Sequence, residues 1–257
     1  MYFVHPSSIV RKIWGSSDTI LFIFAGAAAE FALNKAVDWL YFTGRLPSDP
    51  LGRLFSTVEY SRRIVFSKTD DALKAIDQIT SIHKAVENNR GSTIPMWAYR
   101  DVLYMLIDYS IRAFEIIERK LTMLEKQEIY DVFYRMGIRM KLEDLPASYD
   151  DWLLSREQHL NEDLILSEYT IDLFKKYKLH LGRWRYSILL QSQAMVLPEK
   201  VKTYLNVHPV IWIKPLFMIY TAGKRWSFIK YLKDLMLPVK YRRQVNDLDK
   251  VYETLAR

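Results

Sequence analysis

Residues 48–60 read SDPLGRLFSTVEY and open the part of the chain that decides the fold. Asp49 can cap a helix with its carboxylate, and Pro50 suits the first helical position because its missing N–H has no partner there anyway. The spacing of apolar residues after Pro50 predicts a helix that runs to about Phe66.

Residues 69–89 read TDDALKAIDQITSIHKAVENN and predict a second helix, with two acids near the positive end of its dipole. His83 shares one face of this helix with three apolar residues, Ile76, Ile79 and Val86. An imidazole on such a face leaves water and needs a hydrogen-bond partner or a metal. Two interpretations therefore stay open, a core histidine bonded to a carbonyl or carboxylate, and a metal ligand.

Arg53, Thr57 and Tyr60 follow one another at spacings of four and three, so they can point the same way from the first helix. The forked donors of an arginine can hold a carboxylate beside a pocket. A threonine hydroxyl can polarise a water or another small oxygen species. The alternative is a surface arginine beside a threonine that only stabilises the helix.

The rest of the chain also predicts helices, and no segment sustains the alternation of a strand. Five small residues at 25–29, including Gly26, would let another backbone or a flat ligand come close. Helix packing and ligand approach both remain possible there. The fold class predicted is all-α. The further helices expected are 5–15, 18–42, 96–120, 124–136, one beginning at 148, 164–178, 184–195, 198–204, 209–221 and 227–237.

The composition favours one large domain over residues 1–257 and excludes several classes of chemistry. Half of the 257 residues are hydrophobic and none is cysteine, which excludes disulfides, thiolate zinc sites, Cys-ligated iron–sulfur clusters and cysteine nucleophiles. The chain carries none of the glycine-rich or serine motifs of nucleotide-binding proteins and hydrolases.

The net charge of +7 is concentrated at the C-terminal end. We find no nucleic-acid-binding motif and expect no nucleic-acid partner. Aromatic residues alternate with Lys and Arg from Lys224 to Arg243, which indicates either peripheral contact with a membrane or a solvated helix face. Residues 1–15 are too polar for a secretory signal, and no apolar run reaches the roughly 20 residues of a membrane span. We expect a cytoplasmic protein, with any membrane contact peripheral.

The order of the sequence motifs resembles one known family, the catalytic domain of rubber oxygenases (latex clearing proteins) and of ER-bound oxygenases of the mpaB type. The resemblance covers about residues 15–207 and leaves 208–257 as a basic helical extension. The matching segments are the small-residue helix at 25–29, DPLGRLFST at 49–57, IHKAV at 82–86, AYRD at 98–101, LP at 145–146 and LPEKV at 197–201.

This resemblance implies a single-domain helical bundle with a globin-like core that binds haem b. His83 would be the iron ligand, since an axial histidine is the standard anchor of such haem. Arg53 and Thr57 would stand beside the cofactor. The activity implied is that of an oxygenase, a haem-dependent oxidoreductase that uses O₂ on a hydrophobic, unsaturated small-molecule substrate.

The chain departs from the family pattern in several places. Ser56 stands where a lysine can occupy the second axial position, so the distal side would be open. The segment 105–109 replaces a Trp-Val-His motif that family members often show. The acid proposed to act in the rubber-cleaving enzymes has no secure match, and Glu30 and Asp38 are both candidates. The alternative function is a member of the same fold that has lost the cofactor and binds a lipid-like ligand, or acts as a peripheral membrane or scaffold protein.

Overall fold

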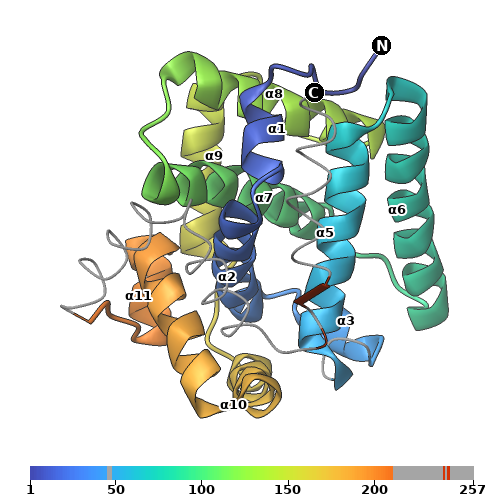
Figure 1. Ribbon diagram of the computed structural model, residues 1–257. Coiled ribbons are helices and arrows are strands. Elements are labelled where there is room, and N and C mark those ends of the chain that lie inside the picture. Colours follow the sequence, from blue (N-terminus) through green and yellow to red (C-terminus); the bar gives the residue numbers. More distant parts are fainter. Residues whose placement is uncertain (45–47, 211–239, 241, 244–257) are drawn as a thin grey trace.

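A computed structural model describes residues 1–44, 48–210, 240, 242 and 243, and the described part of the chain is helical without a strand (Figure 1). The predicted all-α class is therefore confirmed, whereas a globin-like core stays a prediction. The helices are α1 (Ile9–Trp14), α2 (Ser17–Leu33), α3 (Asp38–Phe42), α5 (Pro50–Phe66), α6 (Thr69–Arg90), α7 (Met96–Ile117), α8 (Met123–Arg139), α9 (Tyr149–Glu162), α10 (Glu168–Val196) and α11 (Glu199–Leu205).

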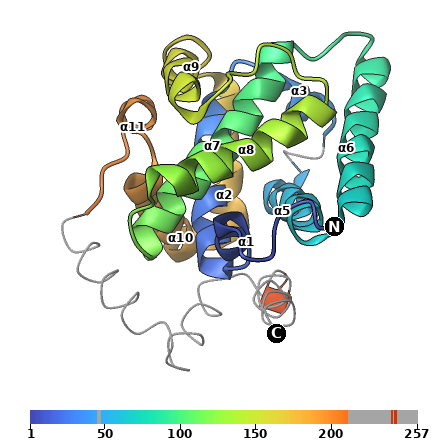
Figure 2. The same ribbon diagram turned by 90° about the horizontal axis from the view of Figure 1, so that it is seen from above.

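Helix α2 is the centre of the fold, with α7 across one side of it and α10 along another (Figures 1 and 2). Its packing on α7 requires a glycine, because a Cβ at Gly26 would overlap the ring of Tyr109. The small residues at 25–29 therefore serve close helix packing at this point. An approaching ligand is not needed to explain them.

The predicted helix over 18–42 is wrong at its middle, because the chain leaves the helix after Leu33. The side chain of Asn34 donates to Asp101 at 2.8 Å and accepts from the backbone N–H of Ala36 at 2.8 Å. The backbone N–H of Lys35 donates to the carbonyl of Asp163 at 2.9 Å. These tertiary bonds replace the next helical turn, and the short α3 begins afterwards.

Helices α5 and α6 begin and end close to the predicted residues. The carboxylate of Asp49 accepts from the backbone N–H of Gly52 at 2.9 Å and caps α5. Gly91 ends α6 with a φ of 70°, a conformation that favours glycine. The two helices pack side by side (Figures 1 and 2), which places the two motif segments of the sequence together.

The two helical pieces predicted at 164–178 and 184–195 are both present, and they meet at a kink at Gly182 within α10. Gly182 has φ 73° and ψ 170°, a conformation that other residues rarely adopt. The expected helix at 227–237, all but the first two residues of the one at 209–221, and most of the segment Lys224–Arg243 lie outside the described residues. None of the described helices has the length and the apolar character of a membrane-crossing segment.

Candidate functional site

His83 lies in the second half of α6 and faces the start of α7. Its ring is 5.1 Å from the ring of Tyr99, measured between centroids. The side chain as a whole is partly buried, but its Nδ1 is shielded from solvent and has no hydrogen-bond partner. His83 is therefore not a core histidine that bonds through Nδ1 to a carbonyl or carboxylate.

The surroundings of His83 keep its ring neutral. Burial is the main cause of a pKa lowered to about 4, the positive charge of Arg53 lowers it further, and Glu87 acts in the opposite direction. A neutral imidazole with a buried nitrogen that lacks a partner has the chemistry of a metal ligand. His83 thus fits the role of an iron ligand in its protonation state and in its unmet bonding requirement.

Arg53 and Thr57 point the same way from α5, as their spacing predicts, and a hydrogen bond joins them. The guanidinium Nη1 of Arg53 donates to Thr57 Oγ1 at 2.7 Å and reaches Ser56 Oγ at 3.4 Å. The Thr57 hydroxyl also contacts the carbonyl of Arg53 at 3.3 Å. Arg53 is close enough to His83 for its charge to act on the imidazole. The structure therefore brings all three predicted residues into one region between α5 and α6.

Glu87 and Tyr99 complete this region, although their hydrogen bond is not predicted from the sequence. Glu87 Oε1 accepts from the Tyr99 hydroxyl at 3.2 Å and from the backbone N–H of Ile94 at 2.9 Å. Burial and the neighbouring Glu87 carboxylate raise the pKa of Tyr99. Glu87 lies four residues after His83, and this spacing alone places the two side chains on the same side of α6.

A second group of polar side chains is buried between α2, α7 and α9, and we call it the Glu30 cluster. Its members are Glu30, Asp101, Asp108, Tyr109, Arg156 and His159. Arg156 holds Glu30 with two bonds of 2.6 Å and Asp108 with bonds of 2.9 and 3.1 Å. The hydroxyl of Tyr109 donates to Glu30 at 2.7 Å. Every charge in this cluster therefore has an opposite charge in contact.

His159 is the second cation of the Glu30 cluster. Its Nε2 lies 3.0 Å from Glu30 and its Nδ1 lies 2.8 Å from Asp101. Burial alone would lower the pKa of His159, but the bonds to Asp101 and Glu30 outweigh it and raise the pKa to about 9. The ring is therefore an imidazolium that donates from both nitrogens.

Asp101, His159 and Asp163 offer three ligand atoms within 4.8 Å of one another, a grouping that could hold a metal ion. A metal would need a neutral imidazole with a free nitrogen. Because both nitrogens of His159 already face carboxylates and its pKa is raised, the arrangement is explained by charge pairing without a metal.

The two acids considered as catalytic candidates are both engaged. Burial raises the pKa of Glu30, but the contacts with Arg156 and His159 outweigh it and hold the pKa well below its usual value. Asp38 forms an ion pair of 2.6 Å with Arg90, whose guanidinium stacks over Trp39. A carboxylate held so strongly in its ionised form is a poor proton acceptor. Glu30 therefore does not fit the role of a catalytic group that takes up a proton.

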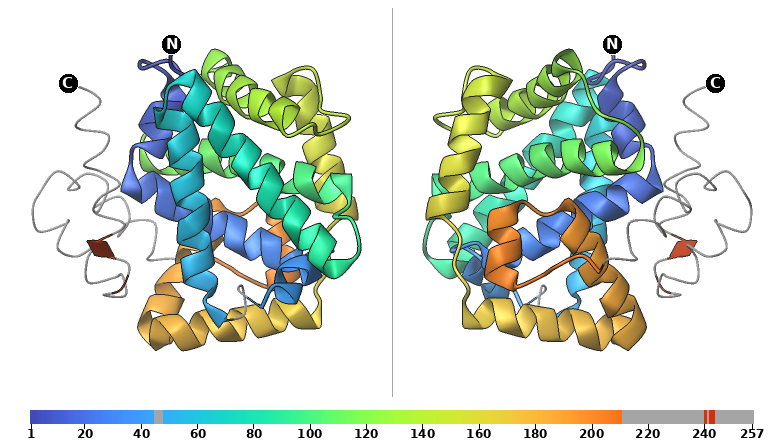
Figure 3. Two further views of the ribbon diagram at one scale, coloured as in Figure 1. Left: turned by 90° about the vertical axis from the view of Figure 1, so that its right-hand side faces the viewer. Right: turned by 90° about the vertical axis from the view of Figure 1, so that its left-hand side faces the viewer.

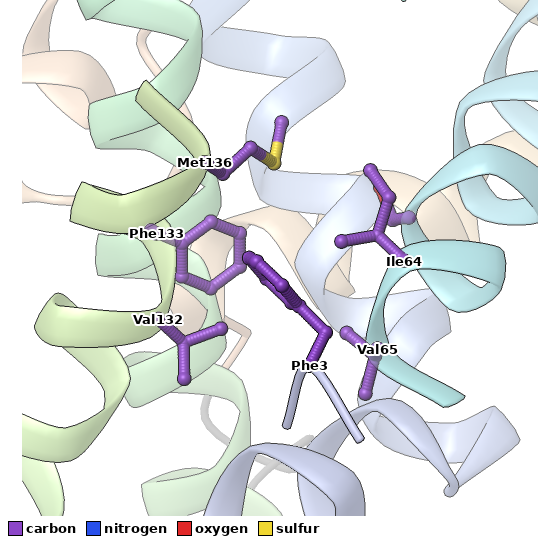
Figure 4. Close-up of a pocket in the computed structure, with 7 residues that line it drawn as sticks. Phe3, Ile64, Val65, Val132, Phe133 and Met136 are labelled. Atoms are coloured by element: carbon purple, nitrogen blue, oxygen red, sulfur yellow. The ribbon is translucent and has the colours of Figure 1, made fainter. Parts of the chain in front are cut away.

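The structure also contains a small apolar hollow between the N-terminal segment, α5 and α8 (Figure 4). Its lining does not include His83, Arg53 or Thr57. The residues around it are Phe3, Ser61, Ile64, Val65, Val132, Phe133 and Met136.

Comparison with known families gives one result. Residues 12–222 match the family described as "ER-bound oxygenase mpaB/B'/Rubber oxygenase, catalytic domain". The match spans most of the chain, so this protein belongs to that family of oxygenase catalytic domains. Neither the curated proteins nor the solved structures gave a match.

Proposed function

We propose that this protein is a haem-dependent oxygenase in which His83 binds the iron of haem b and O₂ reacts with a hydrophobic, unsaturated substrate. The observation that carries the proposal is the neutral ring of His83, whose buried Nδ1 lacks a partner, in a chain of an oxygenase family. A haem bound at His83 would supply the redox chemistry with O₂ that such a reaction requires.

Arg53 would act as the positive group that holds a carboxylate of the cofactor. Its guanidinium carries two parallel sets of donors, which suit a carboxylate such as a haem propionate. Its bond to Thr57 at 2.7 Å fixes the hydroxyl of that residue at the same place. Thr57 would then supply an oriented hydroxyl beside the cofactor, while Ser56 would offer no amino group to the iron.

The surroundings of this region support an apolar substrate. The partly buried Val86, Ile94 and Trp97 pack on a small apolar cluster formed by Ala36, Trp39 and Ala98, at the end of α6 that carries His83. Apolar and aromatic walls with a few oriented polar groups are the usual surroundings of a small-molecule site.

Haem titration of the purified apoprotein tests the iron ligand. The wild-type protein should give a Soret band that saturates at about one haem per chain, since one axial histidine defines one site. His83→Ala should lose most of this absorbance, while His180→Ala, at an exposed histidine of α10, should keep it. A wild-type protein that binds no haem would instead support a member of the fold that has lost its cofactor and binds a lipid-like ligand.

Oxygen uptake tests the activity separately from haem binding. The haem-loaded protein should consume O₂ with an unsaturated apolar substrate and not with its saturated analogue. Thr57→Val keeps the shape of the side chain and removes the hydroxyl, so it should lower the rate while leaving the Soret absorbance in place. Uptake that is equal with both substrates would contradict the proposed substrate class.

A further inference from the structure

Helix α10 exposes a basic and apolar surface around its kink, and we call this surface the α10 patch. It consists of Ile171, Lys175, Lys178, Leu179, Arg183 and Trp184, all of them exposed. The first part of this helix runs along the lower edge of the molecule in Figure 3. Residues 170, 173, 177 and 181 form the buried side of the same helix, so the patch faces outward.

The apolar members of the α10 patch are unusually open to solvent. Leu179 is 78% exposed, Ile171 51% and Trp184 46%. Ile171, Lys175 and Leu179 follow at intervals of four and therefore lie on one line along the helix. Exposed apolar residues that gather on one face indicate a surface that meets a partner.

The charge of the α10 patch selects the class of partner. No acidic residue occurs in the sequence between Asp172 and Glu199, whereas five Lys or Arg residues occur there. Lys175, Lys178 and Arg183 form no ion pair with an acidic side chain of the described residues. The five basic residues of this stretch are Lys175, Lys176, Lys178, Arg183 and Arg185.

The α10 patch has members on both sides of the kink. Gly182 breaks the regular helix between Leu179 and Trp184. Tryptophan prefers the boundary between water and lipid, because its ring is apolar and its N–H can bond to the polar headgroups. Lysine and arginine on either side can extend to lipid phosphates while their aliphatic chains cover apolar surface.

We propose that the α10 patch docks this protein on the surface of an anionic lipid membrane, with Leu179 and Trp184 entering the headgroup region. The contact is peripheral, since Ile171 and Leu179 lie on the outer side of a helix whose other side is packed on the protein. Exposed apolar side chains favour this partner over a nucleic acid, whose recognition would require base contacts or stacking along a groove. The proposal does not depend on haem or on oxygenase activity.

Sedimentation of the full chain with vesicles tests the proposal. We expect binding to vesicles of phosphatidylcholine with 30% phosphatidylserine, and little binding to phosphatidylcholine alone. Each basic residue near an anionic surface strengthens binding by about fivefold. The triple variant Lys175→Glu/Lys178→Glu/Arg183→Glu should therefore bind at least about 100-fold more weakly, and salt should weaken the wild type but have little further effect on the variant.

A matched control changes the same number of charges elsewhere. Lys12→Glu/Lys68→Glu/Lys84→Glu reverses three exposed lysines outside α10, so it has the same net charge as the patch variant. It should keep most of the binding, and circular dichroism should show that both variants are folded. Equal losses in the two variants would show that only net charge matters and would overturn the docking surface.

Insertion of the apolar residues has its own readout. Lipids with brominated acyl chains should quench part of the tryptophan fluorescence of the wild type, and Trp184→Phe should remove that part. Vesicle binding without this quenching would overturn the insertion of Trp184. Binding of the patch to RNA or DNA, without binding to vesicles, would overturn the choice of a membrane as the partner.

Discussion

Replacing Arg156 by methionine should strongly destabilise the protein, because it leaves Glu30 ionised and buried without its main partner. Glu30 has no exposed surface, and Arg156 approaches its two oxygens at 2.6 Å each. Removing one member of a buried ion pair typically costs about 3–5 kcal/mol. A protein of this size changes its melting temperature by about 2–4 °C per kcal/mol, so we expect a decrease on the order of 10 °C.

Arg119→Met is a closely matched control for this prediction. Arg119 also forms a two-fold contact with a glutamate, Glu125, at 2.6 and 2.9 Å, but its side chain is 51% exposed. A surface ion pair contributes about 0–1 kcal/mol. The two arginine–glutamate contacts are alike in geometry, but Arg156 is buried and also bonds to Asp108.

Urea unfolding monitored by circular dichroism measures both variants against the wild type. Glu30→Gln/Arg156→Met removes the stranded charge of Glu30 and should recover part of the loss, while Asp108 keeps its ion pair with Arg112 at 2.6 Å. If Arg156→Met loses no more stability than Arg119→Met, the Glu30 cluster is not buried and coupled as described.

Four further predictions follow from particular contacts. The pKa of His159 is about 9 in the folded protein against 6.5 in the unfolded chain. The stabilisation by its charged ring is therefore complete below about pH 6.5 and is lost as the pH rises through 9, so the free energy of unfolding should fall by roughly 3 kcal/mol over that range. His159→Gln should remove most of this pH dependence. Gly26→Ala should cost about 1–3 kcal/mol in thermal unfolding, because its methyl group overlaps the ring of Tyr109. Thr122→Ala removes the side-chain cap of α8 and should cost about 1 kcal/mol by the same measurement. Ser56→Lys should change the visible absorption spectrum of the haem-loaded protein, because it adds an amino group that can bind iron; an unchanged spectrum would place residue 56 away from the iron.

The sequence predicted the helices best where local signals were strong. Asp49 and Pro50 at the start of α5, and Gly91 at the end of α6, determine their ends by local hydrogen bonding and backbone geometry. The end of α2 was missed because it depends on Asn34 bonding to Asp101, a residue far away in the sequence. No local sequence pattern predicts that contact.

The candidate site was predicted in part for the same reason. The spacing of Arg53 and Thr57 on one helix was enough to predict that they point the same way, and the structure adds the hydrogen bond between them. The buried charges of α9 were missed, although Trp152, Arg156 and His159 follow at spacings of four and three on one face. A charged residue on an otherwise apolar face is a signal for a buried ion pair, but its partners on α2 and α7 emerge only from the tertiary packing.

Restoration of haem binding by free imidazole tests the role of His83 most directly. His83→Gly removes the ring and leaves space where imidazole can take its place. We predict that this variant loses the Soret band of the wild type and regains it when imidazole is added, whereas imidazole should leave the stoichiometry of the wild type unchanged. A His83→Gly variant that binds haem as tightly as the wild type, without imidazole, would contradict the assignment of His83 as the iron ligand.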